Sequence, residues 1–311
     1  MHQKDRKVHT REEKLAAFGR LLDVQHRLRT ECPWDRKQTI DSLRPNTIEE
    51  VFELAEALTK HDYHEIMKEL GDVMEHVIFY AMIGNEKQEF DIADVCNQEA
   101  DKLMFRHPFI NWNETKGDWN IDNKPFHVVN AEMKINSKGQ VVYKSEETSL
   151  DDTPETDLAV EQTWEQIKQK EKDGNESVLS GVPQALPSLI KAYRIQDKAR
   201  NVGFDWKKKE DVWEKVREEL RELEAELEKE DKENSEKELG DFLFSIINAA
   251  RLYHLNPDNA LEQTNRKFIN RFNYIEHKAK ELGKAIGDLS LNQMDALWNE
   301  AKQLENQNKK I

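Results

Sequence analysis

The sequence predicts an all-α protein built from two tandem helical-bundle repeats that are joined by an irregular segment. The pentapeptide KELGD occupies residues 68–72 and again residues 237–241, an offset of 169 residues. In both halves apolar side chains recur every three or four residues, which is the period of an amphipathic helix. The connections between the predicted helices are short, as between antiparallel neighbours in a bundle. A chain of 311 residues is long enough for two such domains.

The apolar period also sets the expected bounds of each helix. Thr47 is the expected N-cap of the second helix, because Glu49 and Glu50 follow in its first turn, where the helix dipole favours negative charge. The expected helices cover residues 11–29, 47–60, 63–83, 91–106, 161–172, 188–201, 211–229, 235–255, 259–282 and 291–304.

A change in composition separates the two repeats. We expect an N-terminal helical domain over residues 1–110, an irregular insert over 111–160 and a C-terminal helical domain over 161–311, because Gly, Asn, Asp, Thr and Pro become frequent between the helical parts. Within the insert, residues 126–129 and 140–143 could pair as a small β-hairpin. A disordered linker is the alternative, and the sequence leaves both open.

Composition and charge narrow the classes of partner and location. The net charge of −15 argues against general nucleic-acid binding and against an anionic membrane surface. Cys32 and Cys96 are far apart and lack metal-binding spacing, as expected of a reduced intracellular protein. The chain has no apolar signal core and no long apolar run, so we expect a cytoplasmic protein.

Each repeat carries two acidic clusters on neighbouring helices. An EExxE pattern at residues 218–222 precedes ExxD at 238–241, and the same patterns stand at 49–53 and 69–72. Residues three apart share a helix face, so a short joint between the helices lets the carboxylates converge. The candidate metal ligands are Glu219, Glu222, Glu238 and Asp241 in the second repeat and Glu50, Glu53, Glu69 and Asp72 in the first.

The angular positions of these glutamates favour a site at the packed edge of the helix. With about 100° per residue, Glu219 lies about 60° and Glu222 about 120° from the centre of the apolar stripe of residues 211–229. Glu218 is nearly opposite that stripe, so we expect it to face solvent or to lie behind the ligands.

The competing interpretation is that the clusters are only solvated surface, which is the usual role of acidic runs on helices. Ser235-x-x-Glu238 also fits a capping box, which would explain that glutamate without a metal. The recurrence of the whole pattern favours a functional site. Gly71 and Gly240 support it, because a glycine inside a helix costs about 1 kcal/mol relative to alanine.

Converging carboxylates repel one another unless protons or a cation neutralise them. Oxygen ligands suit hard cations, so the sequence predicts Mg²⁺, with Mn²⁺ as a substitute. Dinuclear iron is disfavoured, because helical iron sites usually add Glu-x-x-His and no histidine follows any site glutamate at that spacing. His61 and His64 are three apart, but they stand at a helix joint where surface exposure is expected.

A basic pair follows the acidic hairpin in both repeats. Lys267 and Arg271 are four residues apart, and Lys102 and Arg106 have the same spacing, so each pair shares one helix face. Alone, such a pair is more often solvated surface. Its recurrence favours a phosphate-binding role, because arginine can hold a phosphate with two hydrogen bonds and lysine acts as a point charge.

These residues resemble the MazG-type nucleoside triphosphate pyrophosphohydrolases, whose mark is EExxE followed by ExxD on helical hairpins. The resemblance covers both repeats and the segment from Trp164 to Trp206. It implies Mg²⁺-dependent hydrolysis of nucleoside triphosphates to monophosphate and pyrophosphate, with broad base tolerance, in a homodimer. It also implies that Lys267 and Arg271 hold the triphosphate and that Trp298 contacts the nucleotide, although Trp298 could equally pack the last helix.

The expected mechanism is attack of a metal-bound water on the α-phosphorus, with pyrophosphate as the leaving group. Glu218 or Glu219 is the candidate proton acceptor. Asn234 stands where some relatives carry lysine, so no phosphate contact is assigned there. We expect the second repeat to be the main catalyst and the first to support assembly. The alternative function is a non-catalytic nucleotide sensor or helical scaffold, and the preferred base is left open.

Overall fold

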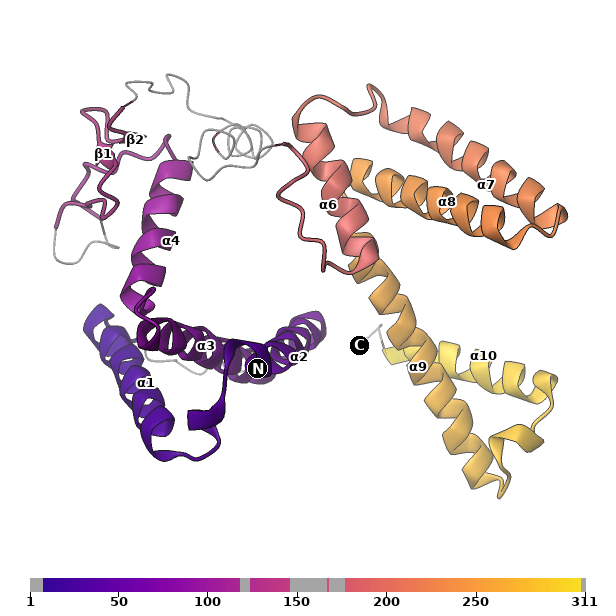
Figure 1. The fold of residues 1–311 in the computed structure, drawn as a ribbon. Coiled ribbons are helices and arrows are strands. Elements are labelled where there is room, and N and C mark those ends of the chain that lie inside the picture. Colours follow the sequence, from indigo (N-terminus) through magenta and orange to yellow (C-terminus); the bar gives the residue numbers. More distant parts are fainter. Residues whose placement is uncertain (1–7, 118–123, 146–166, 168–176, 309–311) are drawn as a thin grey trace. The chain divides into compact units, whose positions relative to one another are not determined.

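The computed structural model describes residues 8–117, 124–145, 167 and 177–308. The chain forms two compact units, Met1–Lys168 and Gln169–Ile311, and each is described by itself. Nearly all regular structure in the described residues is helical, as the sequence predicts, and the exception is one two-stranded sheet (Figure 1). The expected helix over 161–172 lies outside the described residues, apart from Ile167.

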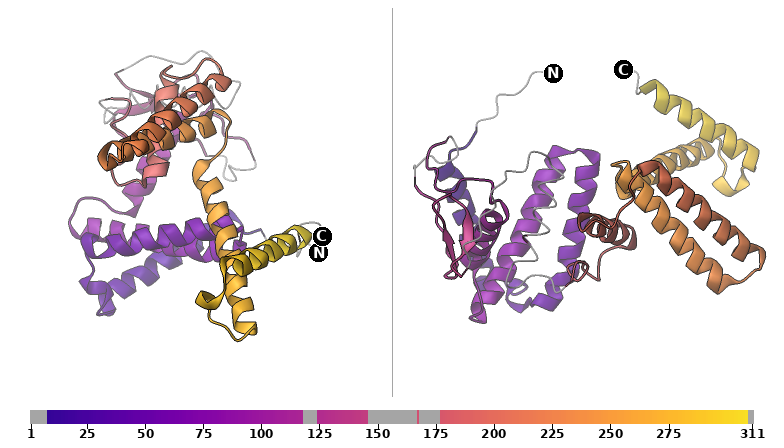
Figure 2. Two further views of the ribbon diagram at one scale, coloured as in Figure 1. Left: turned by 90° about the vertical axis from the view of Figure 1, so that its right-hand side faces the viewer. Right: turned by 90° about the horizontal axis from the view of Figure 1, so that it is seen from above.

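The first unit is centred on an antiparallel pair of helices, α2 and α3 (Figures 1 and 2). Helix α1 packs across α3, and α4 follows α3 and leads into the hairpin of β1 and β2. The elements are α1 Arg11–Glu31, η1 Asp35–Lys37, α2 Ile40–Lys60, α3 Tyr63–Glu86, α4 Ile92–Arg106, β1 Met133–Ile135 and β2 Val141–Tyr143.

The α2–α3 joint is as short as the sequence predicts. His61 ends α2 in the left-handed conformation with φ 54°, and the Asp62 side chain caps α3 by accepting from the backbone N–H groups of His64 and Glu65. The core of this unit contains Leu43 and Phe79, which are almost fully buried. The joint and the packing together hold the two acidic stretches of the first repeat side by side.

The predicted start of α2 at Thr47 is wrong. The helix begins at Ile40, and Thr39 caps it in a reciprocal capping box with Ser42. The usual sign of this motif is Glu or Gln three residues after the cap, and serine takes that place here. Thr47 lies inside the helix, where its hydroxyl donates to the carbonyl of Leu43 at 3.1 Å.

The insert contains a hairpin, but its first strand differs from the expected one. Residues 133–135 pair antiparallel with 141–143, whereas residues 126–129 form no strand. Asn136 closes the turn, because its side-chain oxygen accepts the N–H groups of Lys138 and Gln140, and Gly139 supplies the positive φ of 80°. The sequence pattern missed this strand because it is only three residues long.

The hairpin packs on α4. Tyr143 is buried edge-on against Phe105, with ring centroids 5.2 Å apart. Asp101 of α4 is also buried, and its carboxylate accepts backbone N–H groups of Val129 at 3.0 Å and Asn130 at 2.7 Å. The insert is therefore attached to the helix that carries Lys102.

The second unit repeats the paired helices (Figure 1). Helices α7 and α8 lie side by side and antiparallel, α6 packs on α8, and α10 folds back along α9. The elements are α6 Ser188–Asn201, η2 Lys209–Asp211, α7 Val212–Glu228, α8 Lys232–Leu252, α9 Pro257–Glu281, η3 Ile286–Asp288 and α10 Leu291–Asn308.

The start of α8 removes one competing interpretation of the acidic pattern. The helix begins at Lys232, and the Asp231 side chain caps it by accepting the N–H of Asn234 at 3.2 Å. Ser235 is therefore inside the first turns and is not an N-cap, so no capping box uses Glu238. That carboxylate is left for another role.

Two small cores hold the second unit together. Val212, Val216 and Ala249 are buried between α7 and α8, and Ile275 belongs to a second cluster between α9 and α10. Across the described part of the chain, no helix is both long and apolar enough to cross a membrane.

Candidate functional site

Three of the four carboxylates predicted in the second repeat meet at one place. Glu219 and Glu222 of α7 and Glu238 of α8 each offer an oxygen, and these oxygens lie within 4.8 Å of one another. Glu219 is 7% exposed, whereas Glu222 is exposed. Asp241 is exposed one turn further along α8 and lies outside this group. We call Glu219, Glu222 and Glu238 the second cluster.

The second cluster repels added negative charge. Burial raises the pKa of Glu222 above its usual range, and the neighbouring carboxylates of Glu219, Glu218 and Glu238 raise it further. Such a group gains stability from a bound cation, because a cation removes the repulsion without requiring the carboxylates to take up protons.

A lysine that sequence reasoning missed partly supplies that charge. Lys215 Nζ lies 2.6 Å from Glu219 Oε1 and donates to Glu218 Oε1 at 2.8 Å. Hydrogen bonds to Glu218 and then Glu219 raise the pKa of Lys215. Its place one turn before Glu219 was the available signal. The structure thus places Glu218 beside the cluster through Lys215, and not on the far side alone.

Removing Lys215 should strengthen metal binding in the absence of nucleotide. We expect Lys215→Ala to increase Mg²⁺ affinity severalfold, because a partly exposed ion pair contributes up to about 1 kcal/mol and the metal no longer displaces the ammonium from Glu219. Isothermal titration with MgCl₂ measures this change. Lys237→Ala is the matched control, because Lys237 pairs with Glu233 and not with the second cluster. Unchanged or weaker Mg²⁺ binding would contradict the assigned role of Lys215.

The first repeat brings together three carboxylates in a similar way. Glu50 of α2 and Glu69 and Asp72 of α3 offer oxygens within 4.8 Å of one another, and we call them the first cluster. Glu53 is exposed and lies outside this group. Burial and then the charges of Asp72 and Glu53 raise the pKa of Glu50.

Glu69 shows that the first cluster is incompletely satisfied. Its side chain is almost fully buried, and its Oε1 accepts from Lys68 at 2.9 Å. Its Oε2 is buried and has no hydrogen-bond partner in the described residues. Buried polar atoms are normally partnered, and a carboxylate oxygen left over beside two others is typical of a cation site.

The basic pairs do not join the carboxylates within either described unit. Arg271 of α9 pairs with Glu305 of α10 at 2.7 Å, and Lys267 is exposed on a helix that leads away from the α7–α8 pair (Figure 1). In the first unit, Lys102 pairs with Glu99 of its own helix, and Arg106 lies in the last turn of α4.

Trp298 takes both of the places open to it from sequence. It packs on Phe268 with ring centroids 5.2 Å apart, within the apolar cluster of α9 and α10. Its ring also lies 5.3 Å from the guanidinium carbon of Arg271, close enough for a cation–π contact. The tryptophan therefore fixes one member of the predicted phosphate-binding pair while it packs the last helix.

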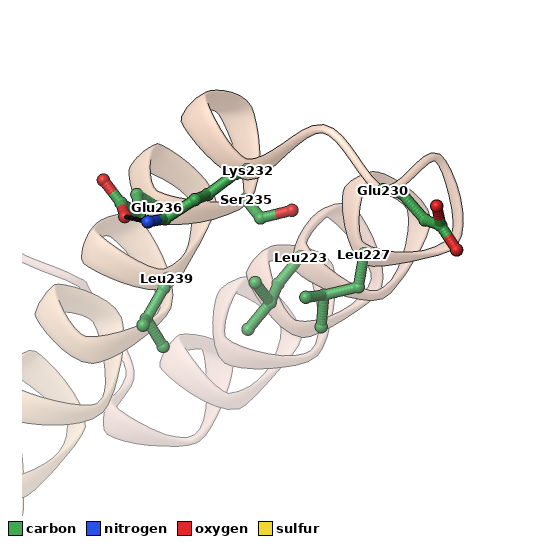
Figure 3. Close-up of a pocket in the computed structure, with 7 residues that line it drawn as sticks. All are labelled: Leu223, Leu227, Glu230, Lys232, Ser235, Glu236 and Leu239. Atoms are coloured by element: carbon green, nitrogen blue, oxygen red, sulfur yellow. Dashed lines mark ion pairs between the residues drawn. The ribbon is translucent and has the colours of Figure 1, made fainter.

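An apolar cavity of about 430 Å³ lies at the free end of the α7–α8 pair. Figure 3 shows Leu223, Leu227 and Leu239 pointing into the gap between the two helices, with charged side chains at its edge. No carboxylate of the second cluster lines this cavity, so it is an apolar surface beside the site and not the site itself.

The fold and the clusters define a class of protein: a tandem all-α protein in which each paired-helix unit carries a divalent-metal type of carboxylate cluster. The MazG nucleotide pyrophosphohydrolase domain matches residues 38–110 and 207–275, which contain the two clusters. The chain belongs to the MazG family.

Relatives match along nearly the whole chain. The nucleoside triphosphate pyrophosphohydrolase/pyrophosphatase MazG of Thermotoga maritima is 35% identical over 288 residues, which cover 92% of this chain and 95% of that protein. The nucleoside triphosphate pyrophosphohydrolase of Escherichia coli K12 is 33% identical over 295 residues, or 93% of this chain and 98% of that protein. The uncharacterized protein YabN of Bacillus subtilis is 38% identical over 276 residues, 49% of its own length.

Proposed function

We propose that this chain is a nucleoside triphosphate pyrophosphohydrolase that releases pyrophosphate and leaves a nucleoside monophosphate. The observation that carries the proposal is the convergence of Glu219, Glu222 and Glu238 inside a stretch that matches the MazG domain. Relatives of similar length carry the same activity in their names. Broad base tolerance remains a prediction from the family resemblance.

The proposed cofactor is Mg²⁺, with Mn²⁺ as a substitute. The donors are all carboxylate oxygens, which suit hard cations. Glu219, Glu222 and Glu238 would hold the ion, and Asp241 is one helical turn from Glu238, within reach of a second position on the same face. When bound, Mg²⁺ polarises phosphate oxygens and lowers the pKa of a coordinated water.

The other residues position the substrate and handle the proton. We propose that Lys267 and Arg271 hold the triphosphate, with Trp298 orienting Arg271 and contacting the nucleoside. Glu218 or Glu219 would accept the proton of the water that attacks the α-phosphorus, and Lys215 already holds both carboxylates in place. The negative charge that develops on the phosphate would then meet the ammonium and guanidinium groups.

We propose an N-terminal domain over residues 1–110, an insert over 111–160 and a catalytic domain over 161–311. The second repeat has the helix α10 that brings Trp298 onto α9. In the first repeat the insert packs on α4, and its Trp112 donates to the carbonyl of Met104, so this tryptophan is engaged within the protein. These differences support a catalytic second repeat and a first repeat, with Lys102 and Arg106, that mainly serves assembly.

A product assay tests the proposed reaction. With a panel of ribo- and deoxyribonucleoside triphosphates and MgCl₂, we expect equal amounts of pyrophosphate and monophosphate for several bases. Orthophosphate release would instead indicate an ordinary phosphatase. Tight nucleotide binding without turnover would indicate the sensor, and neither binding nor turnover would indicate the scaffold.

Exposed apolar side chains support a homodimer. In the first unit, Val51, Leu70 and Met74 are exposed on α2 and α3. The positions 169 residues later, which include Leu239 and Leu243, are also apolar and exposed. A repeated apolar surface of this kind usually marks an interface. A partner subunit covering it would also bring a second set of basic residues to the carboxylates.

A charge placed on this surface should separate the subunits. We expect the wild-type protein to sediment as a dimer and Leu243→Glu to sediment as a monomer at the same concentration, because the exposed leucine buries against the partner. Leu255→Glu, at an exposed leucine beyond the end of α8, should stay dimeric. Monomeric wild-type protein in analytical ultracentrifugation would contradict the dimer.

A further inference from the structure

A polar contact joins α2 and α3 next to the first cluster. Thr47 Oγ1 lies 2.8 Å from His76 Nδ1 and 2.7 Å from the hydroxyl of Tyr80, and it donates to the carbonyl of Leu43 at 3.1 Å. A threonine hydroxyl has one proton, and a carbonyl can only accept. If all three contacts form, His76 and Tyr80 both donate to Thr47. His76 is then neutral, with its proton on Nδ1 and a lone pair on Nε2.

This tautomer is the one that a metal-binding histidine needs. Metal-bound imidazoles usually donate their other ring N–H to an oxygen, which fixes the ring and leaves the second nitrogen for the ion. Thr47 provides that oxygen, and His76 is almost fully buried. Within the described part of the chain, Nε2 of His76 makes no hydrogen bond.

His76 also stands on the helix face that carries the first cluster. Asp72 is four residues before it and Glu69 seven residues before it, so the three side chains follow one face of α3. Burial and the charges of Asp72 and Glu53 raise the pKa of Glu50, and a charge on His76 acts in the opposite direction. The imidazole is thus close enough to influence the carboxylates.

The second repeat lacks this imidazole. At an offset of 169 residues, the positions of Thr47, His76 and Tyr80 are occupied by valine, serine and alanine. Val216 and Ala249 are buried apolar residues there. Ser245 is also buried, and its hydroxyl donates to the carbonyl of Phe242 in its own helix at 2.8 Å. The second cluster has therefore only oxygen donors beside it, on an apolar base.

We propose that His76 is a nitrogen ligand of the metal ion at the first cluster, and that this site prefers later transition ions such as Co²⁺ and Zn²⁺ to Mg²⁺. The proposal rests on the metal binding assigned above to the paired carboxylates. Its basis is the unpartnered oxygen of Glu69, the oriented imidazole and the one-turn spacing between Asp72 and His76. Imidazole favours these ions, whereas a site with only carboxylates and water suits Mg²⁺.

The test isolates the first cluster in the full-length protein. Glu219→Gln together with Glu238→Gln disables the second cluster, and any histidine tag is removed. Pulsed electron paramagnetic resonance with bound Mn²⁺ then reports whether a nitrogen is coordinated. We expect ¹⁴N modulation in this background and its loss on His76→Gln, which keeps a hydrogen-bonding side chain toward Thr47, and on His76→Ser, which copies the second repeat.

Calorimetry provides an independent measurement on the same proteins. We expect His76→Gln to weaken Co²⁺ binding at least about tenfold and to leave Mg²⁺ binding within about twofold, because only the nitrogen donor is lost. Bound Mn²⁺ without ¹⁴N modulation, modulation that survives both variants, or equal losses for Co²⁺ and Mg²⁺ would each overturn the proposal. If no ion binds at either cluster of the wild-type protein, the metal assignment itself fails as well.

Discussion

Glu222→Ala is expected to lower pyrophosphate release from nucleoside triphosphates at least about 100-fold, whereas Glu53→Ala leaves most of the activity. Metal ligands contribute at least as much as the groups behind them, whose loss typically costs about 10- to 100-fold. Both residues are exposed and hold equivalent places in the two EExxE patterns, so the two variants disturb the fold to a similar extent. Only Glu222 belongs to a group of converging carboxylates.

The measurement is initial-rate pyrophosphate release at saturating MgCl₂, with melting temperatures recorded to exclude unfolding. An inactive Glu53→Ala beside an active Glu222→Ala would reverse the assignment and make the first repeat the catalyst. If both variants were inactive while still folded, the two repeats would have to act together. In either case the division of labour proposed above would fail.

Arg251→Ala is expected to reduce the free energy of unfolding of the second unit by about 3–5 kcal/mol, because it leaves a charge that is largely buried without its partner. The side chain of Arg251 is 3% exposed, and its guanidinium donates to both oxygens of Asp205, at 2.5 and 3.1 Å. It also donates to Asn248. This contact ties the loop before α7 to α8, and thereby positions the two helices of the second cluster.

Urea unfolding followed by circular dichroism measures the effect. Arg27→Ala is the control, because Arg27 pairs with Glu31 on an exposed helix face, where such pairs contribute up to about 1 kcal/mol. Replacing Arg251 and Asp205 together by apolar residues should restore part of the lost stability, since no buried charge is then left alone. A loss as small as that of Arg27→Ala would show that the buried pair does not hold the loop.

The sequence predicted the paired helices and the meeting of their carboxylates because both depend on local spacing. Three residues along a helix return a side chain to the same face, and a short joint forces the next helix to run back alongside. That logic does not fix the rotation of each helix about its axis. Glu53 and Asp241 share the spacing of the other ligands, yet they lie outside the groups in the structure.

Other features depend on contacts that a single pattern does not encode. The contact of Lys215 with Glu219 requires a choice among several nearby carboxylates, and its neighbour Glu218 competes for the same ammonium. The hairpin strand at residues 133–135 is set by the Asn136 turn and by the packing of Tyr143 on α4. Both arise from tertiary contacts, which helical and strand periods do not report.

The central claim is that Glu219, Glu222 and Glu238 hold a divalent ion at which the triphosphate is cleaved. Crystals grown with Mn²⁺ and a triphosphate analogue whose α,β-bridge resists hydrolysis test it most directly, through anomalous scattering at the manganese edge. We predict an anomalous peak within bonding distance of these three carboxylates and of the analogue's phosphate oxygens. An analogue bound elsewhere, or bound with no metal at the second cluster, would contradict the account.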